Sequence, residues 1–261
     1  MKSLFVFAFL LATMSAAAQV DPAAERQIFD SLNKERTARG LAALRENRRL
    51  TAIAEQHSER MQQEHAISHQ FNGEPDPTTR IVSTGVHVEA TGENVAISLN
   101  ATTAHAALMN SPPHRANILD PKFTEVGIGA VQDGNTIYVT QDFTRTVPDY
   151  SVAEAERRIA GFVADARKNG GGKPLSLVQQ PELRKQACAM AKQGMVSMAK
   201  VRNLPNVSTT VVFTTSDLST SPAPLAKLKN ATGTAMAVGV CYAAAPSQAI
   251  PQYWVAVVTF F

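Results

Sequence analysis

Apolar residues recur at helical spacing in two stretches near the start of the chain. The first stretch covers residues 22–38, where Asp21 can cap the helix. The second covers residues 49–64 and carries one apolar face made of Leu50, Ile53, Ala54, His57 and Met61. A shorter helix is predicted over residues 102–109, stopped by the two prolines that follow it. The first half of the chain is therefore expected to be rich in helix.

Two strands are predicted to close this half. Residues 126–132 and 136–143 are apolar runs on either side of Asp133-Gly134-Asn135, a strong signal for a hairpin turn. Between the second and third helices, residues 66–92 carry Gly73, Pro75, Pro77 and Gly85 and are predicted to be loop. The pattern thus combines helices and strands, which indicates an α/β protein.

The second half repeats parts of this pattern in the same order. The matched segments are Ala24-Glu25-Arg26-Gln27-Ile28 with Ala155-Glu156-Arg157-Arg158-Ile159, Leu44-x5-Leu50-x3-Ala54 with Leu177-x5-Leu183-x3-Ala187, Val126-Gly127-Ile128 with Val238-Gly239-Val240, and Tyr138-Val139 with Tyr253-Trp254. Matches in order predict a duplication, joined near residues 146–149. The second copy, residues 150–261, is shorter and degenerate because its middle carries no histidine.

The first residues are predicted to be a secretory signal peptide, residues 1–18. Lys2 precedes the apolar run 4–12, and Ala16-Ala17-Ala18 fits a small-residue cleavage site. The run is too short to span a bilayer, and no later stretch is apolar enough for a transmembrane segment. The chain is therefore expected to be secreted, either extracellular or periplasmic.

The charge balance is nearly neutral, with 25 basic and 22 acidic residues. No run of lysine and arginine supports a membrane patch, and no basic surface argues for nucleic acid. Neither is expected as a partner.

Only two cysteines are present, Cys188 and Cys241. Export would allow them to form a disulfide, and two buried free thiols are the alternative. All six histidines lie between His57 and His114. The second half, which holds both cysteines, therefore has no histidine that could activate a cysteine nucleophile. Acid–base or metal chemistry is therefore expected only in the first half. His57 is expected to be a buried structural histidine, since it lies on an apolar helix face.

Residues 24–145 carry six motifs that resemble, in order, the CAP superfamily in its bacterial form. They include Leu32-Asn33-x2-Arg36-x3-Gly40-Leu41-x2-Leu44-x2-Asn47-x2-Leu50, Ala54-x2-His57-Ser58-x2-Met61, Gly92-Glu93-Asn94-Val95-Ala96, Met109-Asn110-Ser111-Pro112-x-His114-Arg115-Ala116-Asn117-Ile118-Leu119 and Phe123-Thr124-Glu125-Val126-Gly127-Ile128-Gly129. This superfamily groups cysteine-rich secretory, antigen 5 and pathogenesis-related 1 proteins. The resemblance implies a CAP (SCP) domain over residues 22–146, built as a three-layer α-β-α sandwich with a surface cleft.

The family's cleft usually holds two histidines and two acidic residues. By resemblance these are His69, Glu93, His114 and Glu125. Glu125 is the available substitute for a glutamate that many members carry on the helix before the last histidine, where this chain has Leu108-Met109-Asn110. Taken alone, Glu93 would also fit a helix cap, and His114 a histidine bonded to backbone in a proline-stiffened turn. The order of the motifs favours the cleft for both.

Imidazoles and carboxylates together suit zinc or another divalent cation. A zinc-bound water can become a nucleophile near neutral pH, and Glu93 is the candidate base. Family members are mostly binding or signalling proteins, so a binding module for a lipid, an envelope component or a protein partner is favoured over an enzyme. The alternatives are a metal-dependent hydrolase acting on peptide or cell-wall material, and a structural extracellular protein with an empty cleft.

Overall fold

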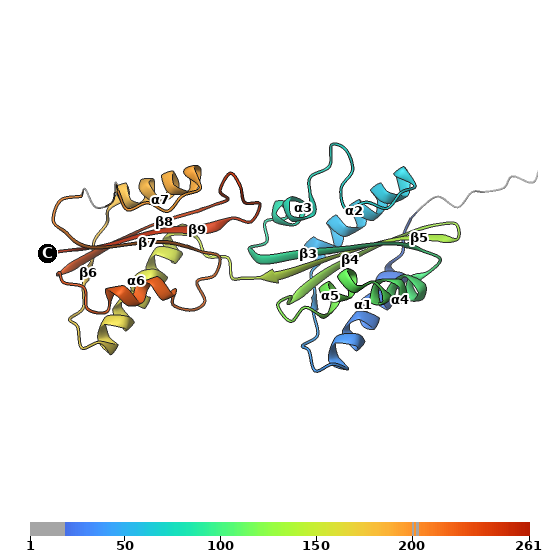
Figure 1. Cartoon of the computed structure of the whole chain (residues 1–261), viewed down its shortest axis with the longest axis horizontal. Helices are drawn as coiled ribbons and strands as arrows, with labels where there is room; N and C mark the ends of the chain where they lie inside the picture. The colour runs from blue at the N-terminus through green and yellow to red at the C-terminus, as the bar shows by residue number, and fades with distance from the viewer. Residues whose placement is uncertain (1–18, 200, 202–203) are drawn as a thin grey trace, which may run out of the picture.

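The computed structural model describes residues 19–199, 201 and 204–261 (Figure 1). The predicted signal peptide, residues 1–18, lies outside the described residues. Over the described part of the chain, every helix is too short or too polar to cross a membrane. The strands form two separate sheets, one in each half of the chain.

The first sheet and its helices, residues 19–146, are called here the N-terminal unit. Its strands are β1 (Gln19–Val20), β2 (Arg45–Glu46), β3 (Val88–Ser98), β4 (Glu125–Asp133) and β5 (Thr136–Thr146). Its helices are α1 (Pro22–Thr37), α2 (Arg48–Glu64), α3 (Pro77–Ser83), α4 (Ala101–Asn110) and α5 (Pro112–Leu119). The strand order is β1-β4-β5-β3, and β2 runs parallel to β4. Strand β3 therefore forms an edge of the sheet.

Helices cover both faces of this sheet (Figure 1). Helices α1, α4 and α5 bury one face, around Ile28, Leu32 and Phe143. Helices α2 and α3 bury the other, where Leu50 and Met61 are fully enclosed. The three-layer α-β-α sandwich expected from the resemblance is confirmed.

The segment 66–92, predicted to be loop throughout, contains α3 and the start of β3. Asp76 caps α3 by accepting the Thr79 amide, and Pro77 opens the helix. Strand β3 escaped prediction because polar residues stand at its core-facing positions, Glu93 and Asn94 among them. The Pro112-Pro113 pair ends α4, as predicted, and also begins α5.

The second sheet and its helices, residues 152–260, are called here the C-terminal unit. It comprises α6 (Val152–Asn169), β6 (Ser176–Leu177), α7 (Pro181–Gln193), β7 (Val207–Thr215), the 3-10 helix η1 (Ala223–Leu228), β8 (Ala235–Ala243) and β9 (Gln252–Phe260). Its strand order, β6-β8-β9-β7, matches the order β2-β4-β5-β3 in the first sheet, including the parallel first pair. Helices α6 and η1 cover one face and α7 the other (Figure 1).

Two packing details occur in both units. Buried Arg36 of α1 donates to the carbonyls of Ala42, Ile118 and Asp120, and buried Arg167 of α6 donates to those of Lys173, Leu228 and Ala231. Gly127 lets the backbone of α2 lie against β4, and Gly239 does the same for α7 and β8. The duplication itself stays a prediction, which these parallels favour.

One of the sequence matches between the halves is out of register. Tyr138 packs with Met61 of α2, on one face of the first sheet. Tyr253 packs with Ile159 of α6, on the opposite face of the second sheet. Because neighbouring strand residues point to opposite faces, a shift of one residue accounts for the difference.

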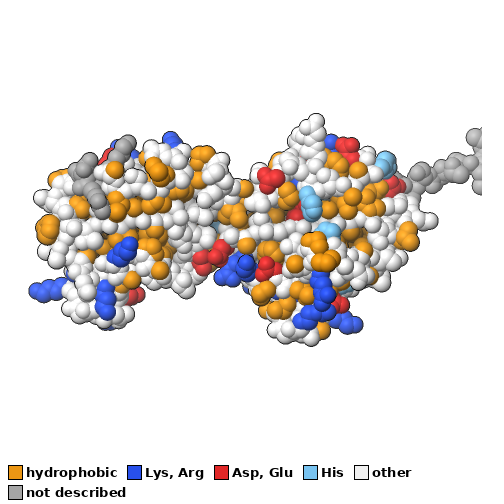
Figure 2. Space-filling model, in the orientation of Figure 1, with side chains coloured by type: hydrophobic (Ala, Val, Ile, Leu, Met, Phe, Trp, Pro, Cys, Tyr) orange, Lys and Arg blue, Asp and Glu red, His pale blue; other side chains and the backbone are white. Residues whose placement is uncertain are grey.

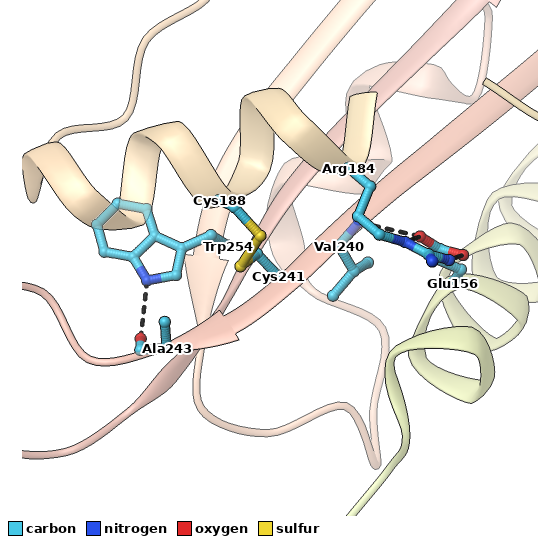
Figure 3. The surroundings of a disulfide bond; sticks show 7 residues. All are labelled: Glu156, Arg184, Cys188, Val240, Cys241, Ala243 and Trp254. Atoms are coloured by element: carbon cyan, nitrogen blue, oxygen red, sulfur yellow. Dashed lines mark hydrogen bonds and ion pairs between the residues drawn. A yellow bond between two sulfur atoms is a disulfide. The ribbon is translucent and has the colours of Figure 1, made fainter. Parts of the chain in front are cut away.

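A disulfide joins Cys188 of α7 to Cys241 of β8 (Figure 3). The two Cα atoms lie 5.0 Å apart, and 53 residues separate the cysteines in sequence. Beside the disulfide, the Trp254 indole donates to the Ala243 carbonyl at 3.0 Å. In the chain-entropy account, closing a loop of this length stabilises the fold by about 4 kcal/mol. The disulfide thus fastens one helical layer of the C-terminal unit to its sheet.

Replacing Gly127 by alanine tests the close approach of α2 and β4. A Cβ atom at this position would lie 2.2 Å from the backbone carbonyl carbon of Leu50. We expect Gly127→Ala to lower the free energy of unfolding by about 2–3 kcal/mol, because helix and strand must separate. Gly161→Ala, on an open face of α6, should instead raise it by up to about 1 kcal/mol. Urea unfolding measures both, and equal effects would contradict the packing described.

Candidate functional site

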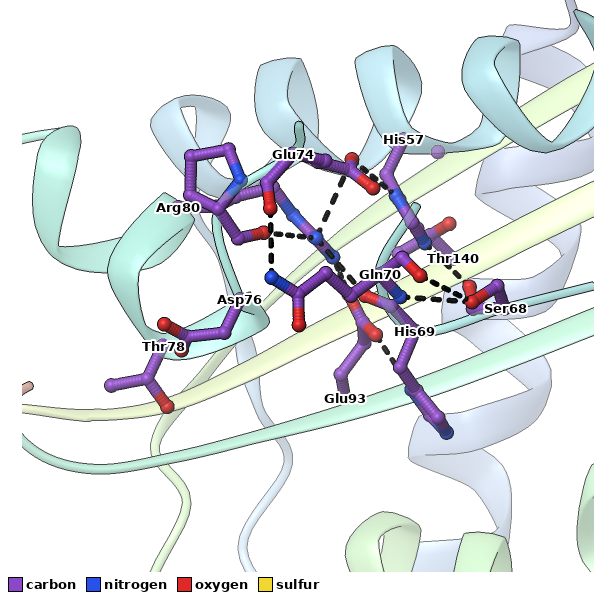
Figure 4. Close-up of polar contacts among 12 residues, drawn as sticks. His57, Ser68, His69, Gln70, Glu74, Asp76, Thr78, Arg80, Glu93 and Thr140 are labelled. Atoms are coloured by element: carbon purple, nitrogen blue, oxygen red, sulfur yellow. Dashed lines mark hydrogen bonds and ion pairs between the residues drawn. The ribbon is translucent and has the colours of Figure 1, made fainter. Parts of the chain in front are cut away.

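His69 and Glu93 meet at the edge of the N-terminal sheet (Figure 4). Glu93 lies on the edge strand β3, and its side chain is only 2% exposed. His69 lies in the loop after α2, and its Nδ1 is 2.7 Å from Glu93 Oε1. The imidazole is 53% exposed and its Nε2 makes no hydrogen bond within the described residues. The pair therefore holds one ring nitrogen of His69 in place and leaves the other facing solvent.

Arg80 of α3 binds the second carboxylate oxygen of Glu93. Its guanidinium forms an ion pair with Oε2 and also donates to the carbonyls of His69 and Pro75, each at 3.0 Å (Figure 4). Both Arg80 and Glu93 are buried, so each charge depends on the other for compensation. Arg80 thus ties the His69 loop to β3, a role the sequence analysis missed. The cap Asp76 followed by Pro77 was the available signal for the helix that carries it.

A second histidine–carboxylate pair, His57 with Glu74, holds the loop that carries His69 from its buried side. Buried His57 of α2 places Nδ1 2.7 Å from Glu74 Oε1 and Nε2 2.8 Å from the Ser68 carbonyl oxygen (Figure 4). Burial works to raise the pKa of Glu74, but the Phe71 amide, His57 and Arg80 outweigh it and lower that pKa. Since both ring nitrogens of His57 are engaged, it is a structural histidine, as expected.

Asp142 of β5 lies opposite Glu93 in the sheet register and is fully buried. Burial, and then the negative charge of Glu93, raise the pKa of Asp142 well above its usual value. A protonated Asp142 leaves a single negative charge, on Glu93, for Arg80 to balance. Asp142 is therefore the second carboxyl group beside Glu93, and no motif in the sequence singled it out.

The backbone of His114, in α5, is held to strand β3 from the other face of the sheet. Asn94, the residue after Glu93, points to that face and donates to the His114 carbonyl at 3.0 Å. Asn117 donates to the Glu93 carbonyl and to the Asn94 side chain, which fixes α5 against β3. Burial, and then the positive charge of His69, lower the pKa of His114. The two histidines thus flank one edge strand and sense each other electrostatically.

Glu125, predicted as the fourth site residue, lies in a different group. Its carboxylate accepts from Arg45 at 2.8 Å, Asn47 at 2.7 Å and Thr146 at 2.8 Å. It begins β4, and β5 separates β4 from the edge strand that carries Glu93. Burial works to raise its pKa, but the three donors outweigh this and lower it. Glu125 therefore connects β4 to the start of α2, and the structure does not bring it to His69 and Glu93.

The residues at this edge do not fit a closed zinc site with three or four protein ligands. Over the described ranges, no group of three or more His, Cys, Asp or Glu side chains is arranged to hold a metal ion. Glu93 already uses both oxygens, one for His69 and one for Arg80. The donors left for a cation are His69 Nε2 and the His114 ring, which would leave most coordination positions to water or to a ligand.

The buried carboxyl pair predicts a pH effect that Asp142→Asn should remove. Because folding raises the pKa of Asp142, its protonated form stabilises the fold at low pH, and this contribution is lost as pH rises through the raised pKa. We expect Asp142→Asn to gain stability over the natural protein as the pH rises above the ordinary carboxyl range and toward the raised pKa of Asp142. Urea unfolding across this range measures the difference, with exposed Asp165→Asn as the control. A difference that does not change with pH would contradict the assignment.

Two curated relatives match the N-terminal half. The uncharacterized protein YkwD of Bacillus subtilis is 33% identical over 124 residues, which cover 47% of this chain and 48% of YkwD. The uncharacterized membrane protein YlbC of the same organism is 28% identical over 128 residues, 49% of this chain and 36% of YlbC. The chain thus spans about half or less of the length of these relatives.

Solved structures match the same half. An extracellular protein with an SCP domain from Bacillus anthracis is 28% identical, with a TM-score of 0.44 over 47% of this chain and 40% of that chain. A cysteine-rich secretory protein from Staphylococcus aureus is 22% identical, with a TM-score of 0.39 over 48% and 39%. Residues 29–143 match the cysteine-rich secretory protein family, CAP. The chain therefore contains a CAP domain, which lies in the N-terminal unit.

Proposed function

We propose that the CAP domain is a binding module whose His69 and His114 rings hold a divalent cation, most simply zinc, at the edge of β3. The observation that carries this is the engagement of Glu93 by both His69 and Arg80. A carboxylate that accepts from Nδ1 of a histidine fixes the tautomer in which Nε2 carries the free lone pair. Glu93 is then the residue that orients His69, and it does not contact the cation.

The same contacts make Glu93 a poor base for a hydrolase. A general base must lie within reach of the water it activates and have a free oxygen to accept the proton. Here one oxygen faces His69 and the other faces the buried guanidinium of Arg80. Binding is therefore supported better than hydrolysis. The ligand that completes the coordination is a lipid headgroup, an envelope component or a protein side chain.

Export of the chain to an extracellular or periplasmic compartment belongs to the same proposal. The residues 1–18 have the composition of a signal peptide, and the Cys188–Cys241 disulfide suits an oxidising environment. The Bacillus anthracis structure described above is of an extracellular protein. The division of the exported chain into domains at residues 22–146 and 150–261 is part of this proposal.

Zinc titration by calorimetry tests the cation site. We expect the natural protein to bind one zinc ion, and His69→Ala and His114→Ala each to abolish binding because two imidazoles are the minimum set. Glu93→Gln keeps the hydrogen-bonding shape but loses the charge that holds the imidazole, and should weaken binding about 10- to 100-fold. Affinity should also fall as the solution is acidified, since the rings must be neutral to bind.

Glu125→Gln is the matched control, because Glu125 is a carboxylate of the same domain that lies in a separate group. Its zinc affinity should equal that of the natural protein. Loss of binding in Glu125→Gln, or no zinc binding by the natural protein at all, would contradict the two-histidine site. Turnover of casein or peptidoglycan that disappears in Glu93→Gln would favour the hydrolase instead.

A further inference from the structure

A small cavity lies at the edge of the N-terminal sheet opposite β3, between α1 and β4. Strands β1 and β2 pair with the two ends of β4 and leave Ile128 between them. The cavity measures about 190 Å³, whereas pockets for drug-sized ligands usually measure about 300–1,000 Å³. It can therefore enclose a single head group. The lining residues are Pro22, Glu25, Arg26, Phe29, Glu46 and Ile128.

The Glu25 carboxylate lines this cavity without a cation to balance its charge. It accepts the Ala130 amide at 3.1 Å and forms no ion pair among the residues that the structure describes. Arg26, the one cation of the lining, pairs with Asp30 at 3.3 Å instead. Burial raises the pKa of Glu25 to about 7, although the Ala130 hydrogen bond lowers it. Three acidic side chains add to the rise: Glu55, Asp21 and Glu46.

The matched cavity of the C-terminal unit has a guanidinium at this point. Glu156 of α6, which the sequence matches pair with Glu25, also lines a cavity. It accepts from Arg184 of α7 at 3.0 and 2.7 Å and from the Val240 amide at 3.3 Å (Figure 3). The second unit thus shows which group satisfies a glutamate at this position.

Thr51 stands in the N-terminal unit where Arg184 stands in the C-terminal unit. In each unit a glycine of the sheet lies against the covering helix. A Cβ atom at Gly127 would lie 2.3 Å from the Thr51 nitrogen, and one at Gly239 would lie 2.5 Å from the Arg184 nitrogen. The two contacts align the two positions. The N-terminal unit therefore keeps the glutamate and lacks the guanidinium.

We propose that this cavity binds a guanidinium group, the side chain of an arginine on a partner polypeptide. Glu25 would pair with it as Glu156 pairs with Arg184, and exposed Glu46 adds a second negative charge. The apolar side chains of the lining would contact the methylene stem of the arginine. A metal ion fits less well, because the described ranges contain no group of three or more metal-ligating side chains.

The surface charge is mixed, which makes the cavity itself the source of selectivity. On the face shown in Figure 2, the described basic and acidic side chains are dispersed over both units and form no broad patch of one sign. Long-range attraction of a polybasic partner is therefore weak. A single arginine should be sufficient for binding.

Titration of the full chain with acetyl-Gly-Arg-Gly-amide, followed by NMR of ¹⁵N-labelled alanine, tests the proposal. The Ala130 amide should shift with saturation at about millimolar peptide or below, because it donates to Glu25. The peptide with neutral citrulline should not bind, and the lysine peptide should bind at least about threefold more weakly, since an ammonium lacks the fork geometry. Free arginine should also bind more weakly, because its carboxylate is repelled. Since the raised pKa of Glu25 is about 7, affinity should fall as the pH falls through that value.

Two variants remove the site in different ways. Glu25→Gln keeps the size of the side chain but loses its charge, and should weaken peptide binding at least about tenfold. Thr51→Arg places a guanidinium where the second unit has Arg184, and should weaken binding equally by filling the cavity from within. Glu89→Gln, exposed on β3, is the matched control and should bind like the natural protein.

The cavity lies at the opposite edge of the sheet from His69 and His114, so replacing both by alanine should leave peptide binding unchanged. This separates the arginine site from the cation site. The proposal is overturned if the arginine peptide leaves the Ala130 amide unshifted, if the citrulline peptide or free arginine binds as tightly, or if Glu25→Gln binds normally. A shift caused by calcium ions and not by the arginine peptide would overturn it as well.

Discussion

The buried ion pair between Arg80 and Glu93 is the interaction on which the candidate site depends. The two side chains are 9% and 2% exposed, so neither charge has water to stabilise it and each requires the other. Removing one partner of such a pair typically costs about 3–5 kcal/mol. Because Arg80 also binds the His69 carbonyl, the same pair positions the exposed imidazole. Charge compensation in the interior thus determines the geometry at the surface.

The candidate site lies along the edge strand β3, and its two histidines belong to opposite helical layers. A strand inside a sheet separates whatever packs on its two faces, whereas an edge strand allows side chains to approach each other past its open side. His69 comes from the layer of α2 and α3, and His114 comes from the layer of α5.

Polar residues in the site made part of the fold hard to predict. Strand β3 carries Glu93 and Asn94 at positions that are buried in the sandwich, so its hydrophobic alternation is interrupted. These residues are stable there because Arg80, Asn117 and the strand neighbours provide hydrogen bonds and charge. In contrast, α1, α2 and the β4–β5 hairpin bury ordinary apolar faces, and their periodicity was sufficient to predict them.

The sequence by itself determined the helices with continuous apolar faces, the hairpin turn, the order of the family motifs and the candidates His69, Glu93 and His114. These follow from local spacing, which a single chain segment carries. Only the tertiary structure decided that Arg80 is the charged partner of Glu93 and that Asp142, not Glu125, is the carboxyl group beside it. Such contacts join residues far apart in sequence, and burial, charge compensation and strand register select them only once the layers have packed.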